Sequence, residues 1–315
     1  MITTIAALTL GILSASMPAQ TDTTFAVRAP MRLVMDNFSG AITVRAWNRD
    51  AVRVKADHSS RSFLVVRRNG PNLVVVVEHR RGIPTTVEYE LTVPTWMALQ
   101  LGGVSTEISI EGTQAEIKAE SVSGDVVVVG GSGFVTVGSV SGDVSVKGAT
   151  GKVQVNAVSG DARIEHANGP IVASSVNGDV VLQDIDSNDV QASTVNGEVI
   201  YEGVIQDGGD YHFGSHGGDV TVAVPSRVNA TVSVSTFQGD FSSDFPVSFT
   251  GTRHGSNQFS FTLGSGSARL ELESFQGEIR LRRPDSNTTG YRYRYDKTHT
   301  TKSKSKDHES EDEQP

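Results

Sequence analysis

A six-residue phrase repeats at a nearly constant step through the middle of the chain. A small residue is followed by valine, a polar residue, glycine, an acidic residue and a further apolar residue. Copies begin at Ser121, Ser139, Ala157, Ser175 and Thr194, and their glycines lie 18, 18, 18 and 19 residues apart. A step this short indicates one supersecondary unit that cannot bury a face alone, so neighbouring copies must cover it in a stack.

Apolar residues alternate on both sides of each phrase, which predicts two short strands per repeat. Inward candidates are Val135 and Val137 before one phrase and Val144 and Val146 after it. Val140 interrupts this alternation because an outward polar residue is due there, so we expect a bend or bulge. The sequence therefore predicts an all-β fold, a parallel and right-handed β-solenoid with rungs of about 18 to 21 residues.

Less exact copies of the phrase extend the repeat in both directions. A copy around Gly40 indicates that the N-terminal part is built in the same way. A degenerate rung is expected around Phe259 and Phe261, and the phrase around Gly277 is expected to form the last clear rung. The predicted organisation is a signal peptide at 1–19, an N-terminal β-strand region capping the solenoid at 20–98, solenoid repeats at 99–283 and a disordered charged tail at 284–315.

Composition excludes several classes of function. The 315 residues include no cysteine, which rules out disulfides, thiol catalysis and thiolate zinc sites. The net charge of −9 argues against nucleic-acid binding. No glycine-rich nucleotide-binding motif joins a strand to a helix, and no cofactor is expected. After the leader, no segment is apolar and long enough to span a membrane.

The phrase glycines are predicted to be structural, because glycine readily adopts the positive φ that a tight corner can require. The polar residues before them are expected to stack along the solenoid, again in a structural role. These corner glycines are Gly124, Gly142, Gly160, Gly178, Gly197, Gly218, Gly239 and Gly277.

The acidic residue after each glycine is the most suggestive chemical feature. If Asp125, Asp143, Asp161 and Asp179 stack in register, calcium could bridge them, since hard cations accept several carboxylate oxygens. The alternative, which we favour, has no metal: each carboxylate lies at a solvated corner and accepts hydrogen bonds from the turn backbone. The glycine-rich nonapeptide of calcium-binding β-rolls is absent.

The combination of these motifs resembles the bacterial DUF4097 family, the β-strand-repeat putative adhesins. The resemblance is carried by Asp36 to Ile42 with Trp47, by Val87 to Pro94, by the Val-Ser-Gly-Asp and Val-Asn-Gly-Asp phrases, and by Phe275 to Arg283. It covers residues from about Thr24 to Arg283. It implies a parallel β-solenoid in an exported or cell-envelope setting, with no catalytic residues to carry over.

We expect an exported, non-catalytic, adhesin-like solenoid that presents a repetitive surface to an envelope glycan or protein partner. The alternatives are a carbohydrate-active enzyme, a lyase or hydrolase, on the same scaffold, and a purely structural envelope component. A specific site is expected where the repeat fails, as in the insertion at 201–218 and the irregular stretch at 244–267. The sequence does not indicate the ligand or the oligomeric state.

Overall fold

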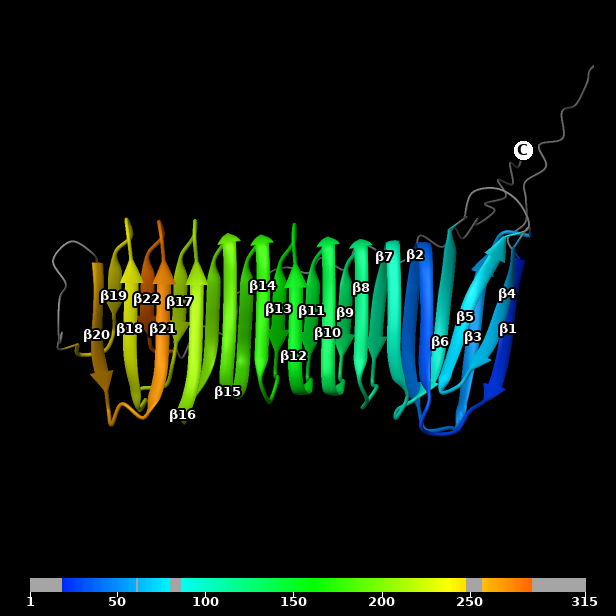
Figure 1. Ribbon diagram of the computed structural model, residues 1–315, viewed down its shortest axis with the longest axis horizontal. Coiled ribbons are helices and arrows are strands. Elements are labelled where there is room, and N and C mark those ends of the chain that lie inside the picture. Colours follow the sequence, from blue (N-terminus) through cyan, green and yellow to red (C-terminus); the bar gives the residue numbers. More distant parts are fainter. Residues whose placement is uncertain (1–18, 61, 80–85, 248–256, 285–315) are drawn as a thin grey trace, which may run out of the picture. The chain divides into compact units, whose positions relative to one another are not determined.

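The computed structural model describes residues 19–60, 62–79, 86–247 and 257–284. The predicted signal peptide and charged tail therefore lie almost entirely outside the described residues. Strands joined by turns and short loops make up the described part (Figure 1). Among these residues there is no helix long and apolar enough to cross a membrane.

Each repeat forms one rung of two strands, and equivalent strands of successive rungs pair in parallel. Val126 pairs with Val144 and Val144 with Ala162, so the register advances by one repeat per rung. The predicted parallel β-solenoid is thereby confirmed. The central rungs comprise β7 (Ala98–Glu111), β8 (Ile117–Ser123), β9 (Val126–Val129), β10 (Ser132–Ser141), β11 (Val144–Lys147), β12 (Thr150–Ala157), β13 (Ala162–Glu165), β14 (Ile171–Asn177), β15 (Val180–Asn196) and β16 (Val199–Ser215).

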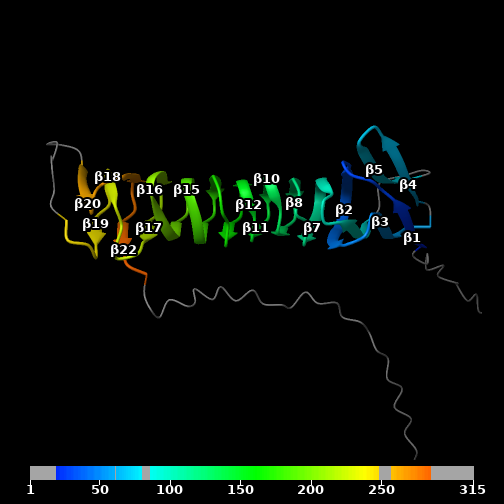
Figure 2. The same ribbon diagram turned by 90° about the horizontal axis from the view of Figure 1, so that it is seen from below.

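The N-terminal region contributes a full rung as well as a cap. β2 (Arg32–Trp47) pairs in parallel with β7 from Arg32 to Arg45, so the phrase around Gly40 belongs to the stack. The predicted boundary at residue 99 left this rung outside the repeats. Beyond it the sheets continue through β6 (Val87–Pro94) and β5 (Asn72–His79), which are parallel to β2, and then change to antiparallel pairing in β3 (Ala51–His58), β1 (Ala19–Ala26) and β4 (Ser62–Asn69) (Figure 1). Figure 2 shows β4 and β5 on one side of this end and β1 and β3 on the other.

At the C-terminal end the rungs do not follow sequence order. β21 (Ala268–Ser274) pairs in parallel with both β16 and β18 (Ala230–Thr236), so it lies between them. Similarly, β22 (Ile279–Arg282) lies between β17 (Val220–Ala223) and β19 (Phe241–Ser243). The chain therefore skips one rung position and returns to fill it. The phrase around Gly277 is the last in sequence but not the outermost in space.

The expected degenerate rung around Phe259 and Phe261 is wrong. Both residues lie in β20 (Asn257–Leu263), which pairs antiparallel with β18. A rung of the solenoid requires parallel pairing, so β20 instead covers the outer edge of β18. Covering an exposed strand edge in this way limits uncontrolled pairing with other chains.

Candidate functional site

The repeated phrase forms the first corner of each rung, between its two strands. The expected bend or bulge is a bend at Gly142 and not a bulge at Val140: Ser139 pairs with Ser121 and Ser141 with Ser123, so the register holds on both sides of the valine. Ser139 is 4% exposed whereas Val140 is 45% exposed. Strand alternation therefore continues as far as Val140, with the hydroxyl pointing inward and the valine outward, and the inward parity changes at the bend before Val144.

The inward hydroxyls hold adjacent rungs together. Ser139 Oγ donates a hydrogen bond to the Gly124 carbonyl oxygen of the neighbouring rung, at 2.9 Å. Such a bond satisfies a backbone acceptor that would otherwise be partly buried without a partner. The sequence predicted stacking for the polar residue directly before each glycine, such as Ser141, and not for this column. The small hydroxyl residue at the start of most phrases was the signal that could have identified it. Equivalent bonds of 2.8 to 3.0 Å come from Ser121, Ser175, Thr194, Ser215 and Ser274.

The corner glycines are structural for a different reason from the predicted one. Of the eight, only Gly124 has a positive φ, 152°. A Cβ on Gly160 would instead lie closer than 3.0 Å to the Gly142 carbonyl, and a Cβ on Gly178 would meet the Gly160 carbonyl in the same way. These residues are glycine because the backbones of adjacent rungs approach too closely for any side chain.

The acidic column hydrogen-bonds along the stack. Asp125 Oδ1 accepts the Asp143 backbone N–H at 2.9 Å, and the same contact recurs from Asp143 to Asp161 and onward to Asp179. Asp179 Oδ1 accepts the N–H of Glu198 at 2.8 Å. Each carboxylate thus caps the turn of the next rung. Within the described ranges, no group of three or more histidine, aspartate or glutamate side chains is placed to hold a metal ion.

Negative charge is concentrated around Glu198, where the acidic column changes from aspartate to glutamate. Burial, followed by the charges of Asp179 and Asp219, raises the pKa of Glu198 above its ordinary value. Further along, hydrogen bonds from Arg280 and then Ser242 lower the pKa of Glu278. Arg280 also lies 3.0 Å from an Asp219 carboxylate oxygen. Arg280 therefore offsets the negative charge around Asp219 and Glu278, and its weaker effect on Glu198 does not outweigh burial and the neighbouring carboxylates.

The outward residues of the first corner form an apolar column that we call the corner ladder. Its apolar members are between 39% and 65% exposed. At one end the His216 and Phe275 rings stack at 4.7 Å, as do those of Phe275 and Phe237. Contiguous exposed apolar side chains are a common feature of interaction surfaces. In order along the stack, the ladder is Phe38, Val104, Val122, Val140, Val158, Val176, Val195, His216, Phe275 and Phe237.

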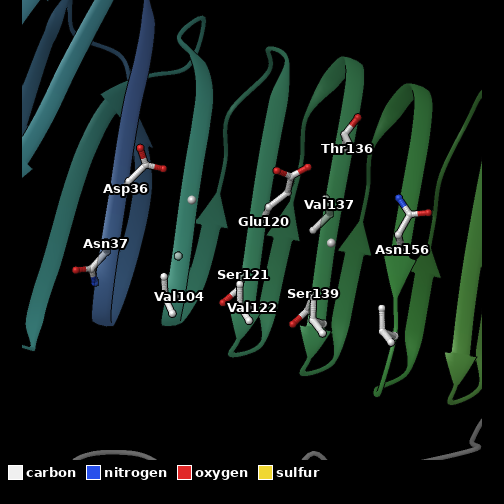
Figure 3. Close-up of a pocket in the computed structure, with 15 residues that line it drawn as sticks. Asp36, Asn37, Val104, Glu120, Ser121, Val122, Thr136, Val137, Ser139 and Asn156 are labelled. Carbon is white, nitrogen blue, oxygen red and sulfur yellow. The ribbon is translucent and has the colours of Figure 1, made fainter.

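A groove runs beside the corner ladder on the same face. The outward column two residues before the ladder contains glycine at Gly102 and Gly138, which leaves gaps between larger neighbours. Asp36 fills part of one gap, since its carboxylate occupies the space that a Cβ on Gly102 would need. Figure 3 shows Asp36, Glu120 and Asn156 on this face, with Val104 and Val122 nearer the corner. This section of the groove has a volume of about 630 Å³.

A second section of the groove lies at the aromatic end of the ladder. Its volume is about 490 Å³, and its lining includes His212, Gly214, Phe237, Glu273 and Phe275. The paired strands between β12 and β16 place Ser174 and Ser193 in the same column, so small polar residues connect the two sections. The second section overlaps the insertion at 201–218, where a specific site is predicted, whereas the first section lies on regular rungs.

The groove offers apolar contact on one side and hydrogen-bonding groups on the other. Glu120 pairs with Lys118 of its own strand at 3.1 Å. In the described part of the chain, no lysine, arginine or histidine forms a salt bridge with Asp36 or Glu273. The two sections therefore each contain a carboxylate without a cationic partner. Such a surface offers side-chain contacts to a long ligand.

These features define a parallel β-solenoid with regular columns of side chains along its corners and faces. The family model described as Toastrack DUF4097 matches residues 31–282. The chain belongs to this family, as its resemblance indicated. No curated protein matches the chain in sequence.

Solved structures with related architecture are distant in sequence. A putative adhesin from Parabacteroides merdae is 10% identical, covers 83% of this chain and 95% of its own, and has a TM-score of 0.41. A putative adhesin from Bacteroides fragilis is 12% identical, covers 84% and 97%, and has a TM-score of 0.32. At this distance the similarity carries no argument about ligand or partner.

Proposed function

We propose that the protein is an exported, non-catalytic, adhesin-like module that binds a glycan or protein of the cell envelope along the corner ladder and its groove. The observation that carries this proposal is the ladder itself. Nine of its ten outward positions, on consecutive rungs, hold an exposed valine or phenylalanine. Outward positions on a solvated sheet face are ordinarily polar. A row of apolar residues there costs solubility and is explained by a partner that covers it.

The acidic column supports a structural role rather than catalysis. Asp125, Asp143 and Asp161 each accept the backbone N–H of the next rung, and their environments repeat. Catalysis by paired carboxylates needs two acids whose environments differ, so that one is protonated while the other is ionised. The proposal therefore places function on the ladder face and stability in the acidic column.

The proposal is tested by binding to separated envelope glycans and envelope proteins. The full chain is compared with a triple variant, Val122→Ser, Val140→Ser and Val158→Ser, which removes part of the ladder. A matched control, Val129→Ser with Val204→Ser, changes exposed valines outside the ladder. We expect the triple variant to lose binding and the control to retain it. If neither the full chain nor the control variant binds any envelope glycan or protein, with calcium or with a chelator, only a purely structural role remains.

A further inference from the structure

The two groove sections lie along one face of the stack, beside the two ends of the ladder. The strands that carry it pair in the order β2, β7, β8, β10, β12, β14, β15, β16, β21 and β18. Nine steps of about 4.8 Å between paired strands give a length of roughly 43 Å. A ligand that uses both sections must therefore be an extended polymer rather than a small molecule.

The backbone of this face is not available to a ligand. The first strands of the rungs pair with neighbours on both sides, as β10 does with β8 and β12, so their N–H and C=O groups are used between rungs. An extended peptide that binds by adding a strand needs an open sheet edge. Recognition on this face must come from side chains alone.

The side chains along the groove match the two kinds of surface that a sugar ring presents. The valines of the ladder offer apolar contact to the C–H groups of a ring. Thr136, Asn156 and Ser193 offer hydroxyl and amide groups to ring hydroxyls. A linear glycan presents both surfaces at every unit, which suits a site whose apolar ladder recurs from rung to rung.

The charges of the groove select among glycans. Asp36 in the first section and Glu273 in the second have no cationic partner in the described residues, and the whole chain carries a net charge of −9. A glycan rich in uronate or phosphate would be repelled, whereas a protonated amino group would pair with these carboxylates. We infer that the groove binds a linear glycan that contains amino sugars. This inference rests on the proposed binding function and names the ligand class for the same face.

The inference is tested by calorimetric titration of the full chain with three linear oligosaccharides of matched length: glucosamine, N-acetylglucosamine and galacturonate oligomers. The glucosamine oligomer is expected to bind most tightly, the N-acetylated oligomer more weakly, and the galacturonate not at all. Raising the salt concentration should weaken only the glucosamine interaction, because screening acts on charge pairs.

Two sets of variants connect this binding to the groove. Asp36→Asn and Glu273→Gln should each weaken glucosamine binding by up to about fivefold, the range of an exposed charge pair, and leave N-acetylglucosamine binding unchanged. Glu111→Gln, which removes an exposed carboxylate from the end of β7 that pairs with β9, beyond the first corner, is the matched control. The triple valine variant should lose both interactions.

Three results would overturn the inference. They are galacturonate binding as tight as glucosamine binding, glucosamine binding that Asp36→Asn and Glu273→Gln leave unchanged, and failure of all three oligosaccharides to bind. In the last case the envelope-protein arm separates the two proposals. If the wild-type chain retains an envelope protein and the triple valine variant does not, the binding function stands with a different ligand. If the wild-type chain retains no envelope protein either, both the binding function and the glycan inference are contradicted.

Discussion

Gly160 at the first corner of its rung and Gly148 at the second corner of its rung are glycine for different reasons. At the first corner, Gly160 lies against the carbonyl of the neighbouring rung, and a side chain has no space. At the second corner, Gly148 has a φ of 70°, and a Cβ there would meet nothing within 4 Å. Asp184 occupies the corresponding position two rungs further on, with a φ of 54°. Position 160 thus demands glycine itself, while position 148 demands only a residue that tolerates left-handed backbone.

The largest expected effect is that of Gly160→Ala at the first corner. Its Cβ would collide with backbone atoms of Gly142, which cannot move without disturbing the pairing of both rungs. We expect a loss of about 3 kcal/mol or more in the free energy of unfolding, at the upper end for overpacking. Chemical denaturation measures it, and a loss below about 1 kcal/mol would show that the rungs separate easily.

Gly148→Ala at the second corner should cost less, about 1 to 2 kcal/mol, because only the left-handed backbone is penalised. Gly148→Asn should cost less again, since asparagine tolerates this region. At position 160, asparagine should be at least as damaging as alanine. An equal cost for alanine and asparagine at position 148 would contradict the assigned reason for that glycine.

The hydroxyl column of the first corner offers a reciprocal pair of variants. Ser139→Ala removes the hydrogen bond to the Gly124 carbonyl and should cost about 1 kcal/mol. Ala157 occupies the same position one rung on and has no hydroxyl. Ala157→Ser should therefore stabilise the fold by a smaller amount through a bond to the Gly142 carbonyl. Destabilisation by Ala157→Ser would contradict the inward orientation of this column.

The smallest effects concern charge in the acidic column. Burial and neighbouring carboxylates raise the pKa of Glu198, so its ionised form destabilises the fold as the pH rises above about 4.5. Glu198→Gln should therefore give a small increase in melting temperature at pH 7 and none at pH 3.5. Glu278 is the control with the opposite sign, because Arg280 lowers its pKa. Glu278→Gln should lower the melting temperature at pH 7, and the difference should fade as the pH drops. The same sign for both variants would contradict this account.

The sequence predicted the stack because its signal repeats: inward residues such as Val135 and Val153 pair in register, as the spacing required. It did not predict the order of the C-terminal rungs. The spacing from Gly239 to Gly277 shows how many residues separate two phrases. It does not show that β21 returns to a position between β16 and β18. Such a return depends on which strand edge is left open, and local periodicity carries no information about that.

The candidate site was harder to predict for a related reason. Apolar periodicity identifies buried positions, so Val140 was interpreted as a disturbance of the pattern rather than as an outward residue. Here the polar residue, Ser139, is buried and the apolar residue, Val140, is exposed, which is the reverse of the usual arrangement. The hydroxyl of Ser139 points inward because it donates a hydrogen bond to the Gly124 carbonyl oxygen of the preceding rung. The groove, in turn, depends on side chains from several rungs and has no signature within one repeat.

The central claim is that strand alternation continues up to the first corner, with the Ser139 hydroxyl inside and the Val140 side chain outside. The chain has no cysteine, so single substitutions report accessibility without background. The direct measurement is the rate of native-state thiol labelling of Val140→Cys and Ser139→Cys. Val140→Cys should react at nearly the rate of the unfolded chain, and Ser139→Cys at least about a hundredfold more slowly, since it becomes accessible only through local opening. A protected thiol in Val140→Cys together with a reactive one in Ser139→Cys would contradict the claim.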